Sequence, residues 1–348
     1  PTSANVEYYA KIVLENSVRR SLLSISNKVI ADAHDDANDS RAVLENAQKL
    51  IFELTDANHS ATFKTPKDII PRAIEAIERL YHTRDAFTGV PSGLIELDQM
   101  TSGFQKSELI IIGARPSVGK TALALSMASH IAIKEKIPTA FFSLEMSDMQ
   151  LMQRLISSVS KIPSDKIRTG ILKMSDFQSI QDAAGHIYDA PLYIVDMPNM
   201  KLLDLRAMAR RLVAQFGVQI IFIDYLTLIS SENTLIPRHE QIAEISRSLK
   251  SLARELNIPV VALSQVRRDA EGKKPMLADL RESGSIEQDA DVVMFLHRDR
   301  VDTSKEGGTA EQAIETELIM AKQRNGPIGD IKIIFLPRYT KFVSKSKD

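Results

Sequence analysis

The sequence contains no cysteine among its 348 residues. Disulfide bonds, thiolate metal sites and cysteine nucleophiles are therefore excluded. Its 44 basic and 45 acidic residues nearly cancel, so any contact with nucleic acid must come from a local cluster of charge. No apolar run is long enough to span a bilayer, and no signal peptide stands at the start. We therefore expect a soluble, cytoplasmic protein that makes no membrane contact.

The length and the 44% hydrophobic composition are enough for one large domain and a smaller piece. Apolar residues recur at mostly helical spacing over residues 5–31 and again over 40–54, where Ser40 caps the run. Because two helices alone bury little surface, residues 1–54 look like part of a larger helical domain or an assembly surface. The acidic stretch 32–39 fits a metal site less well than a solvated loop. The chain begins at Pro1, so we expect a fragment.

A linker with one helix is predicted over residues 55–91. Residues 65–68 form a helix-start signature, and an apolar stripe follows over residues 69–81. Such a stripe packs either on the large domain of its own chain, at 92–348, or on a neighbouring subunit, and the residues alone do not decide.

Residues 109–127 predict a strand, a phosphate-binding loop and a helix. Backbone N–H groups at a helix start supply donors and a positive dipole end for polyphosphate. Lys120 is expected to reach the β- and γ-phosphates, and Thr121 to ligate Mg²⁺. The predicted nucleotide cradle consists of Ala114, Arg115, Pro116, Ser117, Val118, Gly119, Lys120, Thr121 and Ala122.

One residue departs from the strict motif, which has glycine where this chain has Ala114, while Gly113 stands one place too early. An alanine is tolerable there only if its φ is negative. The alternative, a chance glycine loop before a helix, is disfavoured because strand, loop and helix all occur in the required order.

Two carboxylates follow apolar strand-like runs, Glu145 after residues 139–143 and Asp224 after 218–223. Open α/β sheets bind ligands at the carboxyl ends of their strands. Glu145 is therefore a candidate base that deprotonates the attacking water, with a surface charge as the alternative. Asp224 is a candidate Mg²⁺ carboxylate, acting directly or by orienting the ligands, with a helix N-cap as the alternative.

Three further polar residues belong to the candidate site. Gln265 ends an apolar run and can sense the γ-phosphate by a hydrogen bond. Lys322 and Arg324 alternate on one strand face and can both reach a triphosphate, although solvated edge charges are the alternative. Between these, residues 279–289 contain no aromatic side chain for base stacking. Backbone amides near 283–285, together with Arg281, suit phosphate contacts instead.

Six motifs in this order closely resemble the replicative DNA helicases of the DnaB family. They are GARPSVGKT, FFSLEM, IIFIDYLTLI, VVALSQVRR, DLRESGSIEQDADVVMFLHR and AKQRNGPIG. The resemblance covers roughly residues 65–340. It implies a RecA-like α/β core with a mainly parallel sheet flanked by helices, preceded by a small all-α segment and a linker helix.

The resemblance also implies a ring of six subunits around single-stranded DNA, using ATP and Mg²⁺. Primase and a helicase loader are implied partners, and the helix at 66–84 would dock on the adjacent subunit. The implied roles are a catalytic glutamate at Glu145, a Mg²⁺ aspartate at Asp224, a γ-phosphate sensor at Gln265, a DNA-binding loop at Arg281, Glu282 and Gly284, and a basic pair acting in trans at Lys322 and Arg324.

Two other functions compete with ATP-driven unwinding. One is a RecA-like DNA-dependent ATPase that assembles on DNA without unwinding it. The other is a nucleotide-regulated scaffold that recruits a primase. The linker helix and the loop at Arg281 favour the helicase over the first of these.

Overall fold

The computed structural model places most of the chain. It describes residues 3–35, 39–58, 65–67, 69–71, 74, 75, 78, 87–231, 235–267, 273–280, 284–298 and 313–345. The chain divides into two compact units, residues 1–84 and 85–348. Most of the predicted helix at 66–84 therefore lies outside the described residues, as do residues 36–38 of the acidic stretch.

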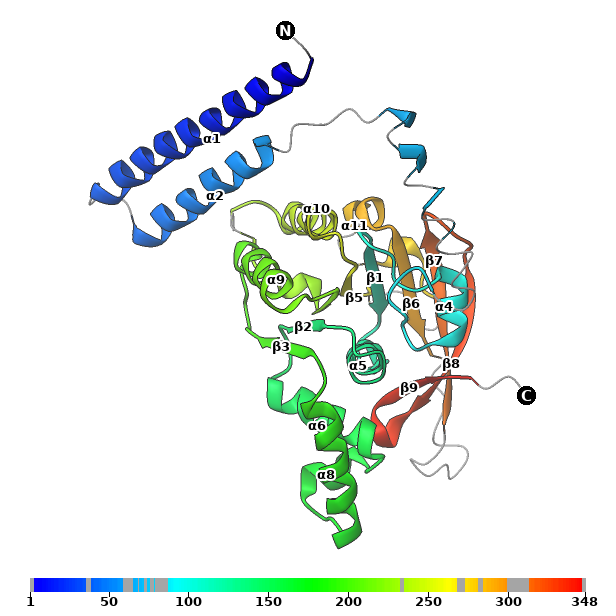
Figure 1. Ribbon diagram of the computed structural model, residues 1–348. Coiled ribbons are helices and arrows are strands. Elements are labelled where there is room, and N and C mark those ends of the chain that lie inside the picture. Colours follow the sequence, from blue (N-terminus) through cyan, green and yellow to red (C-terminus); the bar gives the residue numbers. More distant parts are fainter. Residues whose placement is uncertain are drawn as a thin grey trace. The chain divides into compact units, whose positions relative to one another are not determined.

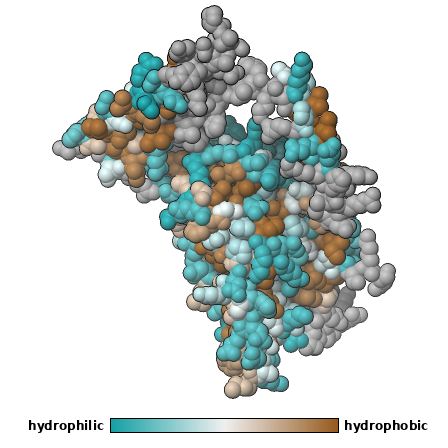
Figure 2. All heavy atoms as spheres, in the orientation of Figure 1, coloured by the Kyte–Doolittle hydropathy of each residue, from teal (hydrophilic) through white to brown (hydrophobic). Residues whose placement is uncertain are grey.

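The first unit contains two helices that pack against each other, α1 (Ser3–His34) and α2 (Ser40–Asn58). Both predicted helices are present and are longer than predicted. Hydrophobic side chains lie on the surface of this pair in Figure 2, and Val13, Leu23 and Leu44 are each at least 60% exposed. No helix of the described residues is long and apolar enough to cross a membrane.

The second unit is built on one nine-stranded sheet in the order β3-β2-β4-β5-β1-β6-β7-β8-β9 (Figure 1). The first six strands in that order are parallel to one another, and the last three continue the sheet antiparallel. The predicted, mainly parallel sheet is confirmed. The strands are β1 (Leu109–Ala114), β2 (Thr139–Ser143), β3 (Leu192–Asp196), β4 (Ile220–Asp224), β5 (Val260–Gln265), β6 (Val292–His297), β7 (Ile314–Gln323), β8 (Gly329–Leu336) and β9 (Lys341–Ser344).

Helices cover both faces of the sheet, which explains why its central strands are continuous apolar runs. In β1, Ile110 and Ile112 belong to one core, and Leu109 and Ile111 belong to the core on the other face. The first core includes α4 (Ile95–Thr101), α5 (Lys120–Ser129), followed by the π-helical turn η1 (His130–Lys134), and α6 (Asp148–Ser160). The second includes α9 (Leu202–Phe216), α10 (Arg238–Leu256) and α11 (Gly284–Asp289).

The remaining elements are short or peripheral. They are α7 (Ser164–Thr169), α8 (Met174–Tyr188) and the 3-10 turns η2 (Leu226–Leu228), η4 (Leu277–Asp279) and η5 (Pro337–Tyr339). Residues 147–150 fit a capping box by their sequence. The box is present at the start of α6, since Ser147 and Gln150 each accept a hydrogen bond from the other's backbone N–H. The apolar period over residues 242–256 predicts a helix there. The helix α10 begins four residues earlier, because its first turn is polar and carries no apolar period.

Gly113 is required by packing. A Cβ on this residue would lie 2.7 Å from two ring carbons of Phe295 and 3.1 Å from Cδ2 of Leu280. Both neighbours are fully buried, so neither can move aside easily. Glycine therefore stands one place before the motif position because the sheet packs tightly there.

We predict that Gly113→Ala lowers the free energy of unfolding by about 1–3 kcal/mol through overpacking. The matched control is Gly185→Ala in α8, where a Cβ meets nothing within 4 Å and helix propensity favours alanine by about 0.5–1 kcal/mol. Urea denaturation measures both. Equal midpoints for the two variants would contradict the packing argument.

Candidate active site

The phosphate-binding loop connects β1 to α5, with Gly119 as the N-cap residue at φ 112°. Ser117 is also in the left-handed region, at φ 66°. Ala114 ends β1 and is not among the residues with positive φ. The condition for an alanine at this motif position is therefore met. A Cβ on Gly119 would lie 3.2 Å from the ring of Phe342 in β9. Backbone conformation and close packing thus both require glycine at 119.

Lys120 and Thr121 share one carboxylate across the sheet. The Thr121 hydroxyl donates to Oδ2 of Asp224 at 2.6 Å, and Lys120 Nζ forms an ion pair with Oδ1 of Asp224 at 3.3 Å. Lys120 Nζ and Asp224 Oδ1 are both buried, and the contact between them is not a directed hydrogen bond. Nζ also lies 3.9 Å from the ring centroid of Tyr225. Asp224 is therefore tied to both motif residues, and the N-cap alternative does not describe it.

Burial lowers the pKa of Lys120, while Asp224 and, less strongly, Glu145 oppose the shift. Within the part of the chain that the structure describes, the buried Nζ makes no hydrogen bond, so its N–H donors have capacity for an anionic ligand. Phosphate oxygens would be the acceptors. The site therefore fits a nucleoside polyphosphate on the chemistry of its own residues.

Glu145 and Gln265 lie at the same edge of the sheet as the loop. Glu145 is exposed two residues beyond β2, and Ser143 at the end of β2 pairs with Asp224. Gln265 ends β5 and pairs with Ala114. The structure therefore brings the phosphate loop, both carboxylates and the glutamine together at one edge.

Lys322 and Arg324 lie toward the opposite end of the strands, where the parallel strands begin. Lys322 pairs with Val293 near the start of β6, and its Nζ donates to the carbonyl oxygens of Glu287 at 2.6 Å and Ala290 at 2.7 Å. Arg324 Nη2 donates to the carbonyl of Gln288 at 2.8 Å. The pair thus converges on the C-terminal end of α11. The alternative of solvated edge charges is wrong for Lys322, because its strand lies inside the sheet and its ammonium is satisfied by backbone carbonyls.

Arg324 cannot reach the phosphate loop of its own chain. Its backbone N–H donates to the carbonyl of Asp291, which in turn bonds to Leu109 at the first residue of β1. The loop follows Ala114 at the last residue, and five steps along a strand span about 16 Å. The structure therefore separates Lys322 and Arg324 from the other predicted site residues within one subunit.

The predicted DNA contacts are only partly described. Arg281 and Glu282 lie outside the described residues, and Gly284 is the exposed first residue of α11. The predicted DNA loop therefore adjoins the helix whose far end contacts Lys322 and Arg324.

A family model for the DnaB-like helicase C terminal domain matches residues 89–344. The chain is 58% identical over 346 residues to the replicative DNA helicase DnaB of Treponema pallidum (strain Nichols), covering 99% of this chain and 76% of that protein. It is 46% identical over 352 residues to the replicative DNA helicase DnaB of Geobacillus stearothermophilus, with the same coverage. The chain belongs to the DnaB family of replicative DNA helicases.

A solved structure of a DnaB-like replicative helicase and its interactions with primase is similar to this chain, with a TM-score of 0.80 at 30% identity. The match covers 99% of this chain and 80% of that one. The RecA-like α/β fold expected from the motifs is thus confirmed. As a DnaB-family member, the chain is an ATP-hydrolysing helicase of DNA replication.

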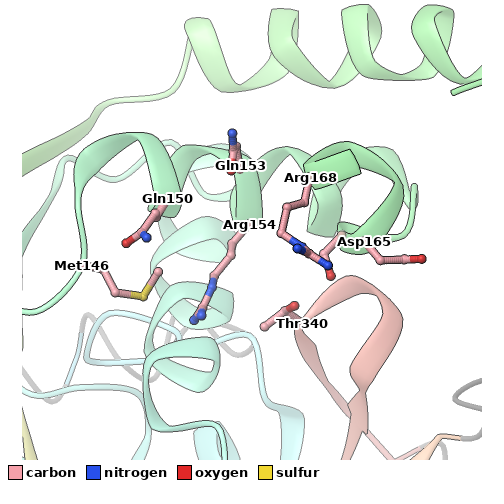
Figure 3. Close-up of a pocket in the computed structure, with 8 residues that line it drawn as sticks. Met146, Gln150, Gln153, Arg154, Asp165, Arg168 and Thr340 are labelled. Atoms are coloured by element: carbon pink, nitrogen blue, oxygen red, sulfur yellow. The ribbon is translucent and has the colours of Figure 1, made fainter. Parts of the chain in front are cut away.

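Two arginines lie close to the predicted site residues and were not among the residues predicted from the sequence. Arg154 in α6 is half-buried, and burial lowers its pKa while Asp224 and Glu145 oppose the shift. It lines a cavity of about 560 Å³ with Arg168 of α7 and Thr340 before β9, and Figure 3 shows these three side chains around one space. Arg298 Nη2 donates to the carbonyl of Ser117 in the phosphate loop at 3.3 Å. The only sequence signal for Arg154 is an arginine beside the buried positions of an amphipathic helix.

The donor set of the DnaB-type site also fits Mg²⁺. Among the described residues, no group of three or more histidine or acidic side chains could hold a metal ion. Mg²⁺ usually needs only one or two protein oxygens, because waters and phosphates complete its octahedron. Thr121 Oγ1 and the Asp224 carboxylate, in contact at 2.6 Å, are such a pair.

We predict that Glu145→Gln keeps ATP binding and lowers hydrolysis about 10²–10⁴-fold, because the amide keeps the shape of the side chain and loses the base. Equilibrium nucleotide binding and steady-state phosphate release measure the two effects separately. Lys120→Ala is the contrasting variant and should weaken binding itself. Normal turnover by Glu145→Gln would place the base on another residue.

Proposed function

We propose that this chain works as a ring of six identical subunits that encircles single-stranded DNA in the bacterial cytoplasm. ATP hydrolysis at the interfaces between subunits drives translocation, and translocation unwinds duplex DNA at the replication fork. One observation carries this proposal. The proposed nucleotide-binding residues lie at the carboxyl ends of the parallel strands, and the basic pair lies toward their amino ends. A complete site would therefore need two subunits.

The residues divide the chemistry as follows. Lys120 and the N–H groups of the loop hold the phosphates, and Glu145 takes a proton from the attacking water. Thr121 and Asp224 would hold Mg²⁺, which would neutralise charge on the phosphate oxygens. Gln265 senses the γ-phosphate by a hydrogen bond. Arg324 of the adjacent subunit, with Lys322 behind it, stabilises the charge that develops on the transferring phosphoryl group.

Exposed apolar residues before the ATPase domain support assembly. Ile69, Ile70 and Ile74 are 48%, 53% and 50% exposed, although a helix start carrying such residues normally buries them. We infer that the segment at 66–84 docks on the adjacent subunit. The exposed apolar faces of α1 and α2 suit a further protein contact, and primase and a helicase loader are the proposed partners.

The loop of Arg281, Glu282 and Gly284 is proposed to bind the single strand through its phosphates, with the Arg281 guanidinium and backbone N–H groups as the donors. This role carries no base information, so binding should be similar across sequences. Lys322 and Arg324 contact the far end of α11, so the proposed DNA loop and the basic pair are joined by one short helix.

We predict DNA-stimulated ATP hydrolysis together with unwinding of a forked duplex by the full chain. Both follow from coupling hydrolysis to movement along one strand. A fluorescence-based unwinding assay and phosphate release on the same substrate measure them. Stimulation without strand separation would favour a RecA-like ATPase that assembles on DNA. Primase recruitment that needs nucleotide but not hydrolysis would favour a scaffold.

We predict that Arg324→Ala leaves ATP binding largely intact and lowers hydrolysis about 10³–10⁵-fold, because an arginine acting in trans contributes that much to phosphoryl transfer. Mixing this variant with Lys120→Ala should restore part of the activity. A mixed interface can pair the intact loop of the first variant with the intact Arg324 of the second.

Subunit exchange is checked separately by fluorescence transfer between labelled chains. If exchange occurs and no mixing ratio restores activity, then either Arg324 acts within its own subunit or the ring needs several intact sites in succession. A dilution series on the unmutated chain decides between these two causes. Activity per subunit that stays constant while the ring dissociates would rule out a role in trans. Activity that falls with dissociation would mean that several intact sites must act in succession.

A further inference from the structure

One buried carboxylate, Asp291, lies beside Arg324 at the amino edge of β1. Its side chain is 8% exposed and stands immediately before β6. Oδ2 accepts hydrogen bonds from Lys250 Nζ at 2.6 Å and from the Leu109 backbone N–H at 2.8 Å. Oδ1 lies 3.5 Å from Arg324 Nε. A single carboxylate therefore joins α10, the first residue of β1 and the turn after β7.

Arg324 is fixed at three points. Its backbone N–H donates to the Asp291 carbonyl at 3.0 Å, Nη2 donates to Gln288, and Nε faces the Asp291 carboxylate. The side chain is nevertheless 49% exposed. A guanidinium has five N–H donors, so most of them stay available for a second anion. The arginine is thus held in place before any ligand arrives, which reduces the entropy that binding must remove.

Asp291 also offsets the repulsion among three cations. Lys250, Lys322 and Arg324 all surround it, and the pKa of Lys322 is lowered by burial and by Arg324, and is raised by Asp291 among other carboxylates. Without the carboxylate, repulsion from Lys250 and Lys322 would push the Arg324 guanidinium outward.

We propose that Asp291 is a positioning residue, which holds the Arg324 guanidinium in the orientation that the nucleotide of the adjacent subunit requires. The inference rests on the role of Arg324 in trans proposed above. Asp291 itself does not touch nucleotide. It acts on a site in another subunit through the side chain that it orients.

We predict that Asp291→Asn keeps nucleotide binding within about twofold and lowers hydrolysis about 10²-fold, the scale of a misplacement of about 1 Å in a catalytic group. The amide oxygen still accepts the hydrogen bond from Leu109, so the start of β1 keeps its contact. The matched control is Asp98→Asn. Asp98 is also a buried carboxylate that accepts backbone N–H groups, from Ser92 and Gly93, and it makes no described contact with Arg324. Its hydrolysis rate should stay near that of the unmutated chain.

Mixed subunits decide where the defect acts. If Asp291 positions Arg324, then Asp291→Asn mixed with Lys120→Ala regains activity, and Asp291→Asn mixed with Arg324→Ala does not. If the substitution damages the phosphate loop of its own subunit, the two outcomes are reversed. Reversal, or normal hydrolysis by Asp291→Asn, would overturn the inference.

Further controls distinguish a failure of this inference from a failure of the proposed role of Arg324 in trans, and from misfolding. The mixture of Arg324→Ala with Lys120→Ala tests the role in trans alone, so its failure after proven exchange would sink the proposed function rather than the role of Asp291. If Asp291→Asn fails to fold, the double variant with Lys250→Met removes both charges of that ion pair together, which proteins often tolerate. It should fold and show the same mixing pattern. Lys250→Met alone keeps Asp291 facing Arg324 and should retain hydrolysis.

Discussion

The direction of the parallel strands is the constraint on which the rest of this structure depends. Six parallel strands, from β3 to β6 across the sheet, all have their carboxyl ends on the same side of the sheet. The phosphate loop, Asp224, Glu145 and Gln265 are each attached to the end of one of these strands, so strand pairing alone brings them together. The antiparallel β7 leaves Lys322 and Arg324 toward the opposite edge. One sheet thus presents the phosphate loop and the basic pair in opposite directions, which is the arrangement on which the proposed ring rests.

A buried aspartate organises each of these two regions. Asp224 holds Lys120 and Thr121, and Asp291 holds Lys250 and faces Arg324. Removing such a carboxylate from water is costly unless cations and hydrogen-bond donors surround it. Those requirements fix the positions of long basic side chains that would otherwise sample many rotamers. The basic groups for which we propose a role on phosphate are therefore held by buried charges of opposite sign.

The sequence determined the sheet core and the phosphate site, because both depend on local patterns. Continuous apolar runs predict buried parallel strands, and single polar residues at their ends predict ligands. The same reasoning failed for α4 and α7, which have six or seven residues and too little periodicity, and for the start of α10, whose first turn is polar. It also missed Arg154, because nothing local says which side chain of α6 comes under the electrostatic influence of Glu145 and Asp224.

Only the tertiary structure decided the surroundings of Arg324. Gln288 and Asp291 belong to the short segment from the end of α11 to the start of β6, whereas Lys250 comes from α10 and Arg324 follows β7. Their convergence depends on the antiparallel pairing of β7 with β6 and on the contact of α10 with Asp291. Gly113 shows the same division. The motif placed glycine near this point, but the requirement for it at 113 rather than 114 comes from the ring of Phe295, far along the chain. Local patterns specify which residue types follow a strand, whereas contacts between distant segments specify what each side chain meets.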